Sequence, residues 1–98
     1  MNKPKFSLGK VVATTLALEA LNESNQSPWE FISRHASGDW GEELCDEDRE
    51  LNEQALSDGS RLLSAYVTKS NQKVWVITEA EDDSGKRAAT TVLLPEEY

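Results

Sequence analysis

The segment Lys73-Val74-Trp75-Val76-Ile77-Thr78 decides the fold, because a run of β-branched and aromatic residues is typical of a strand buried on both faces. Two similar runs flank it along the chain, at residues 61–68 and 89–94. The connections between the three runs are short and polar, at residues 69–72 and 81–86. Short connections predict an antiparallel meander, with the strand at 73–78 in its centre.

The N-terminal half carries the signals of one more strand and two helices. A short strand is expected at residues 10–14, and a helix is expected over residues 16–21, where strong helix formers follow two threonines. A second helix has the clearest start signal in the chain. Ser27 can cap it, Pro28 suits its first position, and Glu30 follows three residues after the cap, which is the pattern of a capping box.

A third helix is expected to begin at Cys45 or Asp46 and to end at Gly59. Its first turn is acidic, as the helix dipole favours. The sequence therefore predicts a small single α+β domain over residues 1–98, with residues 1–6 flexible. We expect a three- or four-stranded antiparallel sheet packed against two or three helices.

Composition excludes several classes of protein. The chain has 98 residues and a formal net charge of −8, which argues against general binding to a phosphate backbone. No apolar run is long enough to span a bilayer or to form the core of a signal peptide. A single cysteine excludes a disulfide scaffold. We therefore expect a cytoplasmic protein that contacts neither a membrane nor nucleic acid directly.

The negative charge is concentrated in one segment. Residues 39–58 hold nine acidic side chains against Arg49 alone, which equals the net charge of the whole chain. One interpretation is a solvated helix that keeps a small domain soluble. The other is an anionic surface that meets a partner protein with a basic surface.

Reactive residue types are scarce. Cys45 and His35 are the only cysteine and histidine, and Cys45 lies among acidic residues that disfavour a negatively charged nucleophile. A zinc site needs about four such ligands, and the chain offers two. We therefore expect no catalytic residue, no metal ligand and no cofactor, and we do not expect an enzyme.

The loop after the second predicted helix combines a cation, an imidazole, an aspartate and an indole. Trp40 can fill the core while Asp39 caps the turn, which is the usual role of such residues. Alternatively, an exposed Trp40 and Arg34 form an anchor for a partner. The candidate partner-binding residues are Arg34, Asp39, Trp40, Glu43, Glu47, Glu50 and Glu53.

Four strings are long enough to be distinctive: Arg34-His35-Ala36-Ser37-Gly38-Asp39-Trp40-Gly41-Glu42, Leu62-Leu63-Ser64-Ala65-Tyr66, Val74-Trp75-Val76-Ile77-Thr78-Glu79-Ala80 and Thr90-Thr91-Val92-Leu93-Leu94-Pro95-Glu96-Glu97-Tyr98. With them, residues 6–98 resemble a family of short, uncharacterised bacterial proteins borne on plasmids and integrative elements, described as plasmid-related and loosely linked to restriction–modification. The chain departs from that family at residues 81–87, where it has a longer loop. The resemblance implies no activity. It implies that the protein is encoded on a mobile element, beside small accessory proteins that include inhibitors of restriction and CRISPR defence.

Two functional hypotheses follow. In the first, the protein is a non-enzymatic interaction protein that binds and inhibits or modulates a host nucleic-acid-handling defence complex through its acidic segment. In the second, it is an accessory protein-binding or dimerisation module of a mobile element with no inhibitory role. Either hypothesis is compatible with a monomer or a dimer.

Overall fold

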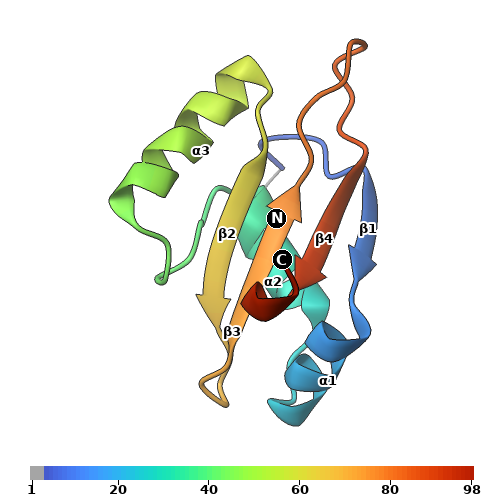
Figure 1. Ribbon diagram of the computed structural model, residues 1–98, viewed down its shortest axis with the longest axis vertical. Helices are drawn as coiled ribbons and strands as arrows, with labels where there is room; N and C mark the ends of the chain where they lie inside the picture. The colour runs from blue at the N-terminus through green and yellow to red at the C-terminus, as the bar shows by residue number, and fades with distance from the viewer. Residues whose placement is uncertain (1–3) are drawn as a thin grey trace.

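The computed structural model describes residues 4–98, which form one mixed sheet with three α-helices and a short 3-10 helix (Figure 1). The strands are β1 (Lys10–Ala13), β2 (Leu62–Val67), β3 (Lys73–Thr78) and β4 (Ala89–Leu93). The helices are α1 (Thr15–Glu23), α2 (Pro28–Ala36) and α3 (Asp46–Asp58), followed at the C-terminal end by η1 (Pro95–Glu97). The predicted small α+β domain is confirmed, and no helix within residues 4–98 is long and apolar enough to cross a membrane.

The strand order is β1-β4-β3-β2. Strands β2, β3 and β4 form the predicted antiparallel meander, and β3 lies inside the sheet. The prediction of a wholly antiparallel sheet was wrong for one pair, because β1 runs parallel to β4, from Lys10 beside Ala89 to Ala13 beside Val92. All three α-helices and two strands separate β1 from β4, and such a long connection allows the chain to return in the same direction.

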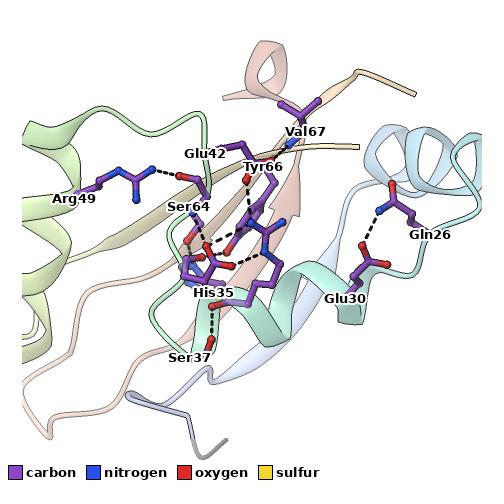
Figure 2. Close-up of polar contacts among 12 residues, drawn as sticks. Gln26, Glu30, His35, Ser37, Glu42, Arg49, Ser64, Tyr66 and Val67 are labelled. Atoms are coloured by element: carbon purple, nitrogen blue, oxygen red, sulfur yellow. Dashed lines mark hydrogen bonds and ion pairs between the residues drawn. The ribbon is translucent and has the colours of Figure 1, made fainter. Parts of the chain in front are cut away.

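The helices begin near the residues that the sequence indicated. The Thr14 hydroxyl caps α1 by accepting from the Ala17 N–H at 3.1 Å, and the Ser27 hydroxyl caps α2. The predicted capping box at α2 is incomplete. The Glu30 carboxylate accepts a hydrogen bond from the Gln26 amide at 2.6 Å instead of reaching back to the cap (Figure 2).

One face of the sheet is covered by α1 and α2. Leu21 and Phe31 from these helices pack against Tyr66, Val76 and Val92 from three neighbouring strands. In Figure 1, α2 lies directly behind the sheet. Burial of this apolar face supplies the main stabilisation of the domain.

Helix α3 lies beside the edge strand β2 rather than over the sheet (Figure 1). The Asn52 amide of α3 donates to the Leu63 carbonyl at 2.6 Å, and its oxygen accepts from the Leu63 N–H at 3.1 Å. The next outward groups of β2 belong to Ala65, which exchanges backbone hydrogen bonds with Trp40 and Glu43. Polar groups of the loop and of α3 therefore close this edge of the sheet.

Residues 1–6 were predicted to be flexible, and residues 1–3 of that segment lie outside the described residues. From Lys5 onward the chain has defined contacts. The Lys5 N–H donates to the Ala36 carbonyl at 2.8 Å, and the Phe6 ring lies 5.1 Å from the His35 ring and 6.2 Å from the Trp40 ring.

Candidate partner-binding surface

Arg34 organises the loop that follows α2. Its Nε donates to the Asp39 carboxylate at 2.7 Å, and its Nη2 donates to the Glu42 carboxylate at 2.9 Å. Its guanidinium also lies 4.5 Å from the centre of the Tyr66 ring. The other Glu42 oxygen accepts from the Val67 N–H at 3.4 Å, so this cluster ties the loop to β2.

The same contacts keep two carboxylates ionised. The hydrogen bond from Arg34 holds the pKa of Asp39 below its ordinary value. Burial would raise the pKa of Glu42, but hydrogen bonds from Arg34 and from backbone N–H groups outweigh it, and the pKa is lowered. Because both carboxylates are about half exposed, each ion pair contributes no more than about 1 kcal/mol to stability.

Trp40 belongs to the core. Only 3% of its surface is exposed, and its Nε1 donates to the Glu53 carboxylate at 2.8 Å. Asp39 caps the turn by accepting from the Gly41 N–H at 3.2 Å. The interpretation of these two residues as a core plug and a turn cap is confirmed. The alternative, an exposed Trp40 that anchors a partner together with Arg34, was wrong.

The carboxylates of α3 form an exposed row. Asp46, Glu50 and Glu53 follow one another at spacings of four and three residues, and Glu47 lies three residues before Glu50, which places these neighbours on the same side of a helix. Within residues 4–98, no cation forms an ion pair with any of these four carboxylates. We call the exposed carboxylates of this region, together with the adjoining loop residue, the acidic face: Glu43, Asp46, Glu47, Glu50 and Glu53. Of these, Glu43 has a cation nearby, the Lys73 ammonium at 3.6 Å.

Arg49 is the one base in this segment, and its side chain is directed inward. Its Nε donates to the Leu44 carbonyl at 3.1 Å, and its Nη2 donates to the Gly41 carbonyl. Figure 2 shows the side chain extended toward the loop that carries Glu42. Its hydrogen bonds therefore go to backbone carbonyls and not to the neighbouring carboxylates, and the acidic face keeps its charge.

A shallow depression of about 520 Å³ lies beside the row of carboxylates. It is lined by Gly38, Trp40, Arg49, Glu50, Glu53 and Gln54. The two carboxylates at its rim can accept hydrogen bonds from a lysine or arginine side chain of a partner. Leu51, which is 60% exposed, adds an apolar contact on the same helix.

A buried series of side-chain hydrogen bonds runs through His35, and the sequence did not predict it. His35 has no exposed surface; its Nδ1 lies 2.5 Å from the Ser64 hydroxyl and its Nε2 lies 2.8 Å from the Thr78 hydroxyl. The Thr78 hydroxyl lies 2.7 Å from that of Thr90, which donates to the Leu8 carbonyl at 2.7 Å.

The donor and the acceptor of each hydrogen bond in this series follow from its last acceptor, the Leu8 carbonyl. A carbonyl only accepts, so Thr90 donates to Leu8 and must accept from Thr78. The single proton of Thr78 is then used, so Thr78 accepts from His35, which carries its proton on Nε2. The Ser64 hydroxyl in turn donates to the unprotonated Nδ1 of His35.

Burial, and then the nearby charge of Arg87, lower the pKa of His35 to about 3. The imidazole is therefore neutral at physiological pH. Because neither His35 nor Ser64 is exposed, the pair presents no nucleophile to solvent. Arg87 is also buried, and it donates to the carbonyls of Ala55, Ser60 and Glu79.

Cys45 lies apart from the buried series of hydrogen bonds. It is exposed at the start of α3, and its thiol donates to the Asp48 carboxylate at 3.3 Å. Within residues 4–98, no three His, Cys, Asp or Glu side chains converge as a metal site requires.

The fold and the surface together define a small α+β domain with one anionic edge. No family model matches the chain, and no curated protein or solved structure is significantly similar to it.

Proposed function

We propose that this protein is a non-enzymatic interaction protein that binds a basic protein surface through its acidic face. The observation that carries the proposal is the row of exposed carboxylates on α3, with which no cation among residues 4–98 pairs, next to an arginine whose hydrogen bonds are directed inward. Because Arg49 is bound to backbone carbonyls, the neighbouring carboxylates stay available to the cations of a partner.

The row is held rigidly, which favours recognition. Asn52 fixes the middle of α3 to β2 through two hydrogen bonds, and the buried Ala55 packs one turn further on. A preformed row of carboxylates loses little conformational entropy on binding. The net charge of −8 also attracts a basic partner over a Debye length of about 8 Å in physiological salt.

The class of partner is inferred from chemistry and from the family resemblance. Surfaces that hold nucleic acid are lined with lysine and arginine, which normally pair with phosphates. A row of carboxylates can occupy such a surface without contacting nucleic acid. Together with the resemblance to proteins of mobile elements, this supports inhibition or modulation of a host defence complex of the CRISPR or restriction type.

A charge-reversal pair tests the proposal. Glu47→Lys/Glu50→Lys removes the centre of the acidic face, while Glu19→Lys/Asp83→Lys makes the same change in net charge at exposed residues on α1 and on the 81–86 loop. Binding to nuclease-treated host extract should fall at least tenfold in the first variant and remain near wild type in the second. It should also weaken in high salt.

A functional assay separates inhibition from mere binding. Cells that carry a restriction or CRISPR system are challenged with unmodified plasmid or phage, with and without the protein. Wild type should raise the efficiency of transformation or plating, and Glu47→Lys/Glu50→Lys should not. The proposal fails if the two charge-reversal variants behave alike in both assays.

The second hypothesis, an accessory dimerisation module with no inhibitory role, is favoured by a separate feature of the sheet, the open edge of β1 described below. It predicts no effect in the challenge assay and no loss of binding on charge reversal.

A further inference from the structure

The two edge strands of the sheet differ in whether their outward backbone groups have hydrogen-bond partners. The outward groups of β2 are closed by Asn52 and by the loop before α3, as described above. At the other edge, β1 pairs with β4 alone among residues 4–98, and in Figure 1 it lies at the rim of the sheet on the side away from α3. A sheet edge with unpaired backbone groups is a template for another strand.

The register of β1 shows which groups are open. The Lys10 N–H donates to the Ala88 carbonyl at 3.1 Å, and the Thr14 N–H donates to the Val92 carbonyl at 3.0 Å. Backbone groups alternate in direction along a strand, so the N–H and C=O groups of Val11 and Ala13 point outward. Their side chains point to the helix-covered face and pack against the core there.

We propose that this edge is an interface with a second copy of the chain, formed by antiparallel pairing of β1 with β1. Placing Val12 of both copies on the two-fold axis brings Val11 of each copy opposite Ala13 of the other. Each such pair exchanges two hydrogen bonds, so all the open groups of both strands are used. A register shifted by one position leaves some of them unpaired or calls on Gly9, whose φ of 63° is not that of a strand.

Charge complementarity supports a second copy as the occupant. In this register, Lys10 of one copy lies opposite Thr14 of the other, on the sheet face that Val12 also occupies. The Thr14 hydroxyl donates to the Glu97 carboxylate at 2.7 Å, so that carboxylate lies where the incoming ammonium arrives. The two-fold axis produces this ion pair twice.

The same lysine disfavours other strands. A lysine at a sheet edge opposes pairing with any strand that brings no carboxylate to it. The second copy brings one, and it also covers Val12, which is 37% exposed. Leu16, in the first turn of the helix that follows β1, is 49% exposed.

The paired segment of each copy is one short edge strand, so the interface is small and the dimer is in exchange with monomer. The dimer would contain one continuous sheet built from two four-stranded sheets, with α3 at each outer end. The inference does not depend on the acidic face binding a partner. If both hold, the dimer displays two acidic faces and can bind with avidity.

Sedimentation velocity of the full chain from 10 μM to 1 mM tests the inference. Wild type should shift from monomer to dimer over this range. Val12→Lys places two ammonium groups together on the axis and should remain monomeric, with an unchanged far-UV circular dichroism spectrum. Glu47→Lys, at the opposite edge of the sheet, is the matched control and should dimerise as wild type does.

A charge-swap pair tests the register. Lys10→Glu and Glu97→Lys each place like charges at both contacts of a homodimer, so each variant alone should be monomeric. Mixed in equal amounts they restore two opposite-charge contacts, and the mixture should dimerise. The inference is overturned if wild type stays monomeric at 1 mM, if Val12→Lys dimerises like wild type, or if the two folded charge variants fail to associate when mixed.

Discussion

Acidification from pH 7.5 to pH 5 should destabilise this protein through one buried side chain in particular, His35. The pKa of this imidazole is about 3 in the folded chain, against an ordinary value of 6.5 that applies once the chain unfolds. The unfolded chain therefore binds a proton first as the pH falls. Stability from the neutral imidazole is fully present above pH 6.5 and declines below it, until the folded protein also takes up the proton near pH 3.

The size of the effect follows from the two pKa values. Each pH unit between them changes the free energy of unfolding by about 1.4 kcal/mol. Between pH 7.5 and pH 5, His35 should therefore remove about 2 kcal/mol of stability. The result at pH 5 is the same for any folded pKa below about 4, because the imidazole is then neutral in the folded state at that pH.

Urea unfolding at a series of pH values measures this loss, and His35→Gln provides the control. Glutamine does not titrate, and its amide can both donate and accept within the buried series of hydrogen bonds. The variant should be less stable than wild type at pH 7.5, and the difference should narrow by about 2 kcal/mol at pH 5. Other ionisable groups, including Asp39 and Glu42, titrate in both proteins and cancel in the comparison.

Nuclear magnetic resonance adds a direct observation, because His35 is the only histidine. The ring nitrogens should report a neutral imidazole protonated on Nε2 at pH 5. A difference between wild type and His35→Gln that stays constant from pH 7.5 to 5, or a ring that titrates near pH 6.5 in the folded protein, would refute the buried, neutral imidazole.

Two further predictions concern the backbone. Asn52→Ala leaves the Leu63 N–H and C=O without partners at the edge of the sheet, so it should cost about 2–3 kcal/mol in urea unfolding and increase aggregation. Gly41→Ala should cost more than about 3 kcal/mol, since an added Cβ would lie 2.0 Å from the Ala65 carbonyl oxygen at a φ of 94°. Gly85→Ala has a similar φ of 78° but open space around it, and it should cost only about 1 kcal/mol. Equal losses at the two glycines would contradict the close approach at Gly41.

Much of the fold could be predicted from local signals. The apolar run at 73–78 and the short links on either side fix a meander, because antiparallel neighbours need only a few connecting residues. The starts of α1 and α2 follow from capping hydroxyls that act within two or three residues, and the start of α3 follows from the acidic residues of its first turn. The parallel pairing of β1 with β4 depends on how a long connection is packed, and no local pattern reports it.

The site was predicted less well, for the same reason. The charge of the segment at 39–58 is a property of composition and could be counted. The hydrogen bonds of His35 to Ser64 and Thr78, and that of Thr78 to Thr90, join elements far apart in the chain. The inward direction of Arg49 likewise depends on how α3 packs against the preceding loop. Alternation along β2, β3 and β4 could have indicated that these three hydroxyls face inward, but it could not have paired them with an imidazole.

The most direct test of the central claim is partner binding by Glu47→Lys/Glu50→Lys measured beside Glu19→Lys/Asp83→Lys. We expect at least a tenfold loss of binding in the first variant, unchanged binding in the second, and unchanged thermal stability in both. Equal binding by the two variants would show that the acidic face does not carry the interaction.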